Sequence, residues 1–213
     1  MFKRQVALPY KEFHNDAINK EVRLKDHITL WIKERMKCSD QHRPFDRHKI
    51  FTLCNYPWIL DAEHKIELLA IEHEIKHHQE AQRIHAHIMN AGAFDLNPYL
   101  VLKVNRNNLI PDTLQKLVSG GLNLKKQLKV VFIGEPGIDE GGVRKEFFQL
   151  IIKELFDPNY GMFTQNNRRL FWFNGMSAEC NVNFELIGIV TGLAISNNVI
   201  LDMQFPMALY KML

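Results

Sequence analysis

Cysteine is scarce in this chain, and long apolar runs are missing. Only Cys38, Cys54 and Cys180 occur in 213 residues, and they form no paired motif. Such an odd and sparse set argues against a disulfide scaffold and favours a reducing compartment. The start of the chain, Met1 to Gln5, is not followed by the apolar core of a signal peptide. We therefore expect a cytoplasmic protein.

Membrane and nucleic-acid roles are also disfavoured. The longest apolar stretch runs from Leu186 to Leu201, but polar residues interrupt it, so it is too short and too polar to span a membrane. The formal net charge of +3 is small for this length and does not predict nucleic-acid binding. With 46% hydrophobic residues, 24% charged residues and no internal repeats, the composition is that of a globular protein, and 213 residues can bury one substantial core, or a core plus an extension.

Residues 1–96 are predicted to be mainly helical. Apolar residues recur at helical spacing from Phe13 to Trp31 and again from Leu68 to Ile88. Asp61 precedes the second pattern and is suited to be its N-cap, although His64 rather than Glu stands at the third position. The expected elements are a helix over residues 10–37, a loop over 39–47, a short strand or irregular packed segment over 51–60, and a helix over 61–89.

From residue 97 the pattern changes to short strands between helices. The alternation of Leu128, Val130 and Phe132 predicts a strand, and Gly188 and Gly192, four residues apart on one helix, would permit close packing against a neighbour. The expected elements are strands over 100–104 and 127–133, helices over 109–118, 143–156 and 184–197, a hairpin over 162–173, and a helix that begins at 207. We predict an α+β fold with a helical N-terminal extension (1–60), a long amphipathic helix and linker (61–96), and an α+β domain (97–213).

The string His73-Glu74-Ile75-Lys76-His77 matches the pattern of zinc peptidases. In that pattern two histidines four residues apart on a helix bind zinc, and the glutamate activates water. This gives an alternative enzymatic hypothesis, with His73 and His77 as metal ligands. Against it, both histidines are expected on the face opposite the apolar stripe of the helix, and Lys76 would place a cation beside the metal. The histidines on the stripe itself, expected to be packed or interfacial, are His78 and His85.

A turn rich in glycine and acid leads into the expected helix over 143–156. Gly141 and Gly142 are expected to adopt φ values that other residues avoid, while Asp139 and Glu140 would complement the helix dipole. A phosphate cradle is disfavoured, because no Gly-Lys-Ser/Thr follows and the acids would repel a phosphate. The turn is therefore interpreted as a packed corner. The helix, apolar around most of its circumference, is expected to be buried on two sides.

The turn belongs to a series of short motifs that follow one another in order. They are Gly134-Glu135, Gly137 to Val143, Lys145 to Phe148, Asp157-Pro158, Tyr160 to Phe163, Leu170 to Phe173, Phe184 to Gly188, Gly192 to Ile195, Asn197, Asp202, Phe205-Pro206 and Leu209 to Lys211. Together they resemble the first lobe of a HECT-type ubiquitin ligase, over about residues 97–213. The earlier stretch from Cys54 to Ala62 is similar to the lead-in of HERC-type members, so the resemblance is to a HERC-like ligase.

The resemblance implies a chemistry and a set of partners. A HECT-type ligase accepts ubiquitin from a conjugating enzyme on a cysteine and passes it to a substrate lysine, so its partners are that enzyme, ubiquitin and protein substrates. The family cysteine lies in a second lobe within a Thr-Cys-Phe-like context, which Cys38, Cys54 and Cys180 do not match. We therefore expect the catalytic cysteine beyond Leu213, and no catalytic, cofactor-binding or metal-binding residue in this chain. Alone, the chain is predicted to be inactive and to act as a scaffold or a non-catalytic binding module.

Overall fold

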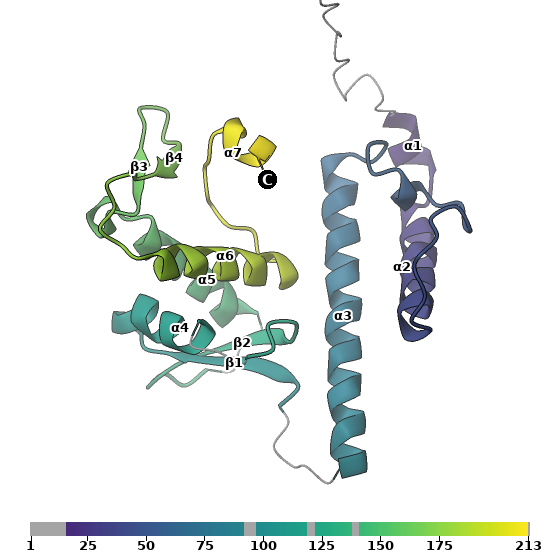
Figure 1. The fold of residues 1–213 in the computed structure, drawn as a ribbon, viewed down its shortest axis with the longest axis horizontal. Helices are drawn as coiled ribbons and strands as arrows, with labels where there is room; N and C mark the ends of the chain where they lie inside the picture. Colours follow the sequence, from purple (N-terminus) through teal and green to yellow (C-terminus); the bar gives the residue numbers. More distant parts are fainter. Residues whose placement is uncertain (1–15, 92–96, 119–121, 138–140, 213) are drawn as a thin grey trace, which may run out of the picture. The chain divides into compact units, whose positions relative to one another are not determined.

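The computed structural model describes residues 16–91, 97–118, 122–137 and 141–212 (Figure 1). The chain forms two compact units, Met1–Ile75 and Lys76–Leu213, and the long helix α3 contributes to both. The α+β class with mainly helical content, expected from the sequence, is confirmed. The predicted division into 1–60, 61–96 and 97–213 stays a prediction. Within the described ranges, no helix is long and apolar enough to cross a membrane.

The first unit is built from α1 (Asp16–Glu21), α2 (Leu24–Asp40) and the beginning of α3 (Ala62–Ala91). The expected single helix over residues 10–37 is wrong, because the chain breaks between α1 and α2, and residues 10–15 lie outside the described ranges. The break has a packing reason. Val22 and Leu24 both reach the same apolar cluster, whereas residues two apart on a continuous helix would face different sides.

Residues 51–60 form the irregular packed segment that was one of the two expected alternatives, with a short 3-10 turn, η2 (Leu53–Asn55). Asn55 fixes this segment. Its Nδ2 donates to the backbone oxygens of Arg47 and Ile50 at 2.8 and 3.0 Å, and its Oδ1 accepts from Trp31 Nε1 at 2.9 Å. The segment packs against α2 and α3 around a core whose buried members are Leu24, Ile28, Ile32, Leu53, Cys54 and Leu60.

Helix α3 begins at the predicted cap. Asp61 Oδ1 accepts a hydrogen bond from the backbone N–H of His64 at 2.8 Å, which confirms Asp61 as the N-cap. His64 Nδ1 also lies 2.7 Å from that oxygen. The imidazole therefore contacts the capping carboxylate itself, whereas a glutamate at this position would reach the backbone N–H of the N-cap residue.

The core of the second unit lies between a parallel strand pair and a set of helices (Figure 1). β1 (Tyr99–Val104) pairs with β2 (Gln127–Phe132), in register from Tyr99 with Gln127 to Val104 with Phe132. Both strands match the expected positions. Their inward residues, all buried, are Leu100, Leu102, Val104, Leu128, Val130 and Phe132.

Three helices enclose this core. α4 (Leu109–Leu117) packs on β1, α5 (Gly142–Leu155) packs on β2, and α6 (Asn181–Ser196) packs on both of these helices. α5 is therefore buried on two sides, as its apolar circumference predicts. Its fully enclosed side chains include Phe147, Phe148, Ile151 and Leu155.

The predicted hairpin is also confirmed (Figure 1). β3 (Phe163–Gln165) pairs antiparallel with β4 (Phe171–Phe173), after the short η4 (Pro158–Tyr160) that follows α5. The expected last helix is present as α7 (Met207–Met212), and Leu213 lies outside the described ranges.

Asn197 connects α6 to the sheet and to α5. Its side chain is buried, its Oδ1 accepts from the backbone N–H of Leu128 at 3.0 Å, and its Nδ2 donates to Leu193 O at 2.8 Å. Arg144 Nη1, from α5, lies 3.4 Å from the same Oδ1 and donates to Leu128 O at 3.0 Å. Three elements thus share one buried polar network, in which each bond strengthens its neighbours.

Gly188 and Gly192 do not serve the close helix packing that their spacing would permit. Both are exposed on α6, and a Cβ added at either position would meet nothing within 4 Å. The spacing of two glycines places them on one face of a helix, but it does not decide that this face is the buried one.

Replacing Gly188 or Gly192 by alanine is expected to stabilise the chain by about 0.5–1 kcal/mol per site, because glycine in a helix interior costs conformational entropy. Urea unfolding of Gly188→Ala and Gly192→Ala measures the gain. Gly141→Ala is a control of opposite sign, since Gly141 has a φ of 108° and alanine is strained there. A loss of stability at Gly188 or Gly192 would instead mean that the helix face is packed.

Candidate functional site

The described part of the glycine-acid turn is an exposed corner and not the packed one expected, because residues 133–137 and Gly142 are exposed. Gly141 immediately precedes α5 with a φ of 108°, as expected for a position that disfavours other residues. The same expectation is wrong for Gly142, which is the first helical residue and has no positive φ. Helix entry needs one left-handed residue here, not two. Asp139 and Glu140 lie outside the described residues, so their expected role at the helix dipole stays a prediction.

An arginine in η3 (Arg106–Asn108), the short 3-10 helix after β1, binds Glu135 of this turn. Arg106 Nη2 donates to Glu135 Oε2 at 3.0 Å, and its Nη1 donates to Glu146 Oε1 of α5 at 2.8 Å. Its guanidinium also lies over the Phe132 ring, 4.1 Å from the ring centre. Hydrogen bonds from Arg106 hold the pKa of Glu135 below its usual range. Glu135 is therefore an internal ion-pair partner, which fits the corner interpretation.

This pair predicts a pH effect that can be measured at one residue. Because the folded-state pKa of Glu135 is lowered, its pairing adds stability that is complete above the unfolded pKa of about 4.3 and is lost as the pH falls through the lowered value. In an NMR titration of side-chain carboxyl groups, Arg106→Gln should raise the pKa of Glu135 towards its ordinary value. Arg168→Gln, on the distant hairpin, should leave it unchanged. A Glu135 that already titrates at its ordinary value in the unmodified chain would contradict the pairing.

Two of the three cysteines are buried and one is exposed. Cys38 and Cys54 are buried, and burial raises the pKa of the Cys54 thiol to about 11. An enzymatic thiol needs the opposite shift and an accessible sulfur. Cys180 is exposed at the N-cap of α6, where its side chain makes no capping hydrogen bond. The carboxylate beside it, Glu179, accepts a hydrogen bond from the Asn183 amide.

The histidines of α3 do not face as expected. His78 and His85 are exposed, whereas His73 and His77 are half-buried, so the expected orientation is reversed. The physical reason is a shift of the inward face along the helix. Among the described positions beyond Ile75, Ile84 is buried, and the half-buried positions are His77, Gln79, Glu80, Ala81 and Ile88. The stripe drawn through His78 and His85 is one position away from this face.

The zinc hypothesis gains no ligand set. A catalytic zinc is held by three protein side chains. In the part of the chain that the structure describes, no group of three or more His, Cys, Asp or Glu side chains is placed to hold a metal ion. His73 and His77 thus remain two positions of a motif without a third ligand among the described residues.

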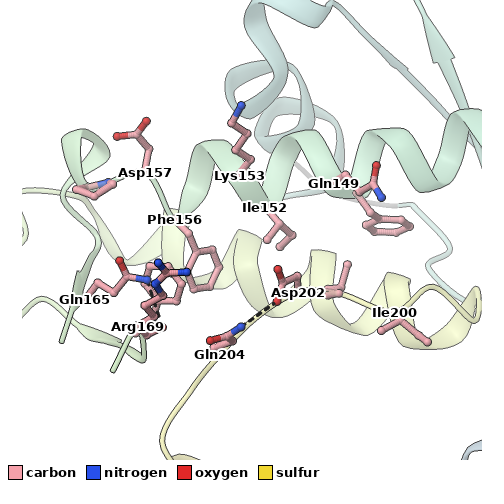
Figure 2. A pocket seen from close by; sticks show the side chains of 14 residues that line it. Gln149, Ile152, Lys153, Phe156, Asp157, Gln165, Arg169, Ile200, Asp202 and Gln204 are labelled. Carbon is pink, nitrogen blue, oxygen red and sulfur yellow. Dashed lines mark hydrogen bonds between the residues drawn. The ribbon is translucent and has the colours of Figure 1, made fainter. Parts of the chain in front are cut away.

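The second unit contains a cleft of about 630 Å³ (Figure 2). One wall is the C-terminal half of α5, a second is the β3–β4 hairpin, and a third is the segment after α6, residues 200–204. The backbone N–H of Phe171 donates to Gln204 O at 2.8 Å, so the third wall is attached to β4. The residues that line the floor and the walls are Phe148, Gln149, Ile152, Lys153, Phe156, Asp157, Pro158, Gln165, Arg169, Phe171, Ile200, Leu201, Asp202 and Gln204.

A cluster of phenylalanines behind the cleft fixes its walls. Phe163 of β3 stacks on Phe156, with ring centres 4.3 Å apart, and meets Phe205 at 5.8 Å. Phe156 also contacts Phe171 at 4.9 Å and Phe205 at 5.6 Å. Aromatic pairs at these distances add directional attraction to their apolar burial. The hairpin and the segment after α6 are thereby held against α5.

The cleft carries charged groups of both signs, Lys153 and Arg169 against Asp157 and Asp202. Asp157 Oδ1 accepts the backbone N–H of Asn159 at 2.7 Å, and Asp202 Oδ1 lies 3.5 Å from Gln204 Nε2 (Figure 2). The cleft therefore combines an apolar floor with walls whose formal charges sum to zero.

The family relationship follows from comparison with known proteins. Residues 149–213 match the family model of the HECT domain (ubiquitin-transferase). The human "Probable E3 ubiquitin-protein ligase HERC3" is 37% identical over 96% of this chain, and the mouse "Probable E3 ubiquitin-protein ligase HERC4" is 36% identical over 97%. The human "Probable E3 ubiquitin-protein ligase HECTD2" is 34% identical, also over 97%.

The matched region is a limited part of these relatives. The chain spans 20% of the length of human HERC3 and of mouse HERC4, and 25% of that of human HECTD2. The aligned stretches include nearly the whole chain, so the first unit takes part in the likeness as well as the second. The chain belongs to the HECT-type ubiquitin-protein ligase family and is HERC-like within it.

Proposed function

We propose that this chain is the larger part of the first lobe of a HECT-type ubiquitin ligase, preceded by a helical extension, and that it serves as a scaffold without the nucleophile. The intact ligase would take ubiquitin from a conjugating enzyme through a cysteine thioester and transfer it to substrate lysines. Its partners would be the conjugating enzyme, ubiquitin and protein substrates. The sparse, unpaired cysteines favour a cytoplasmic location for it.

The proposal rests on the contacts that the residues of the family motifs make in the folded chain. Gly141 turns the chain into α5, Glu135 and Glu146 bind Arg106, and Asn197 ties α6 to β2. Each of these motif residues has a structural contact: Asn197 lies in the core, and Glu135 and Glu146 form ion pairs nearer the surface. Buried thiols at Cys38 and Cys54, the latter with a raised pKa, support a role other than nucleophilic catalysis.

The experiment uses the source protein extended beyond residue 213 to include a Thr-Cys-Phe-like motif. This protein is incubated with ubiquitin, the activating enzyme and a ubiquitin-loaded conjugating enzyme, and the products are separated without reducing agent. We expect an adduct that disappears on reduction and that is lost when the cysteine of that motif is replaced by serine. Cys180→Ser is the matched control and should leave the adduct intact. An extended protein that forms no such adduct would rule out the ligase assignment.

The zinc-peptidase alternative is not favoured by a specific observation. His73 and His77 share a helix, but the described residues contribute no third ligand to them.

A further inference from the structure

We propose that the outer edge of β1 binds an extended segment of a partner protein as an added strand, with an acidic side chain of that segment opposite Lys103. The inference goes beyond the scaffold role, because it assigns a binding mode and a ligand class to one edge of this chain. It requires no ubiquitin transfer and can be tested on the chain alone.

The pairing of β1 with β2 fixes which backbone groups of β1 point outward. Val104 O accepts the N–H of Ile133, the residue after β2, at 2.9 Å. In an extended strand the N–H and C=O of one residue point to the same side, and successive residues alternate. The even-numbered residues of β1 therefore bond to β2. Val101 and Lys103 direct their N–H and C=O groups away from it.

The outward edge of β1 is open between two positions whose N–H groups are already bonded. At its start, the N–H of Tyr99 donates to Asn97 Oδ1 at 2.9 Å, and at its end, that of Asn105 donates to Asp112 Oδ2 at 2.8 Å. Between them, the outward N–H and C=O groups of residues 101 and 103 have no hydrogen-bond partner among the described residues. Such a row of unpaired backbone groups is a template for another strand.

The outer edge of β2 is already closed by side chains and by the following turn. Leu128 N–H donates to Asn197 Oδ1 at 3.0 Å, and Leu128 O accepts from Arg144 Nη1 at 3.0 Å. Phe132 O accepts from the N–H of Glu135 at 3.2 Å. Helices α4 and α5 cover one face of the strand pair (Figure 1). The described part of the sheet therefore offers the β1 edge to a further strand, which would gain affinity through main-chain hydrogen bonds.

The charge beside this edge selects the occupant. The face of the strand pair turned away from α4 and α5 is formed by Tyr99, Val101, Lys103, Gln127, Lys129 and Val131. It carries two lysines and no acid. Lys129 Nζ lies over the Tyr99 ring, 3.8 Å from its centre, whereas the Lys103 side chain is exposed and has no ionic partner among the described residues. Opposite charges on facing residues of neighbouring strands attract, so the complementary group is a carboxylate.

The other charged groups at the two ends of the edge cancel. Lys126 lies at the start, where its Nζ donates to Asn97 O at 2.9 Å. Asp112 lies at the end, and both of its carboxylate oxygens accept hydrogen bonds, from Asn105 N–H and from the Asn108 amide. The two lysines of the outward face therefore stay uncompensated.

A second copy of this chain is a poorer occupant. Antiparallel pairing of two β1 edges would gather Lys103 and Lys129 of both copies on one face of a continuous sheet. Lysine on an edge strand is one of the devices by which proteins prevent such self-pairing. The same lysine attracts a strand that carries Asp or Glu opposite it.

The test begins with a displayed library of random dodecapeptides selected on the immobilised 213-residue chain. We expect an enriched consensus of strand-forming residues that contains Asp or Glu. The affinity of a fluorescein-labelled consensus peptide is then measured by fluorescence anisotropy. Lys103→Glu should weaken binding at least tenfold, and a peptide with Lys in place of its acid should recover binding to this variant. The matched control Lys145→Glu makes the same charge change at an exposed position of α5 and should stay within twofold.

Amide hydrogen exchange measured by NMR separates strand addition from other modes of binding. In the free chain, the Leu102 amide should exchange slowly, because it bonds to β2, and the amides of Val101 and Lys103 should exchange quickly. The peptide should slow exchange at Val101 and Lys103 at least tenfold and leave Leu102 within twofold. Binding without this protection, a library without an acidic consensus, or equal weakening by Lys145→Glu would overturn the proposal.

Two further outcomes would assign the edge to another occupant and so also overturn the proposal. Protection of the Val101 and Lys103 amides that rises with the concentration of the chain, without peptide, would identify a second copy. The same protection in the extended source protein, without peptide, would identify its own following segment. None of these readouts uses thioester formation, so they can fail while the ligase assignment stands, and the reverse also holds.

Discussion

Replacement of Phe163 by alanine is expected to lower the free energy of unfolding by about 3–5 kcal/mol, the usual cost of emptying a buried phenylalanine site. Phe163 is only 4% exposed. Its ring stacks on Phe156 and contacts Phe173, Phe184 and Phe205 at centre distances of 5.4, 6.2 and 5.8 Å. The cavity would separate the hairpin from α5, α6 and the segment after α6, all of which meet at this ring.

Urea unfolding of the second unit measures this effect. When Trp31 and Trp58 of the first unit are replaced by phenylalanine, the fluorescence of Trp172 on β4 reports on the hairpin. The signal then follows the second unit, so the unfolding of two units is not treated as one transition. Phe163→Leu keeps most of the volume and should cost about 1–1.5 kcal/mol. Thr164→Ala, on the exposed neighbour, should stay within about 0.5 kcal/mol. A loss below about 1 kcal/mol for Phe163→Ala would show that the phenylalanine cluster does not hold the hairpin.

Asn197→Ala is expected to lower the free energy of unfolding by about 2–3 kcal/mol. The change leaves the buried backbone N–H of Leu128 without its acceptor and removes the bond to Leu193 O, and an unsatisfied buried group costs about 1–3 kcal/mol. Arg144 also loses one contact of the same network, so the loss in free energy of unfolding is expected to exceed that of a single hydrogen bond. Alanine recovers none of these bonds, because it has no polar side-chain atom.

The same urea experiment tests this second effect. Asn107→Ala is the matched control, since Asn107 is exposed in the loop after β1 and should change the free energy of unfolding by less than about 0.5 kcal/mol. Equal stability of Asn197→Ala and Asn107→Ala would mean that α6 is held to β2 by apolar packing alone.

Local sequence patterns predicted the elements of the second unit well. The strand at Leu128 to Phe132 and the hairpin follow from short-range patterns of apolar and polar residues. The burial of α5 on two sides follows from the apolar residues that cover most of its circumference. The N-cap at Asp61 could also be predicted, because capping needs only a side chain and a backbone group three residues away. These features require no knowledge of what packs against them.

Features that depend on tertiary partners were missed. Periodicity placed Gly188 and Gly192 on one face but could not show that the face is exposed. Asn197 appeared only as a polar interruption of an apolar run and a family motif, whereas its bond partner Leu128 lies far away in sequence. The sequence signal for the buried amide of Asn197 was its position as a polar residue at the C-terminal end of an apolar helix.

The cleft was missed for the same reason. Its walls come from residues 148–158, 165–171 and 200–204, and the bond from Phe171 N to Gln204 O brings the last two together. No single motif contains the pair Lys153 and Arg169. Family resemblance identified the lobe from motif order, but motif order does not report which charged side chains meet in the folded chain.

The central claim is that these 213 residues form a scaffold without the ligase nucleophile. It is tested most directly by incubating the chain itself with ubiquitin, the activating enzyme and a ubiquitin-loaded conjugating enzyme, and by separating the products without reducing agent. The account predicts no ubiquitin adduct of the chain. A reduction-sensitive adduct on Cys38, Cys54 or Cys180, abolished by serine at that position, would contradict it.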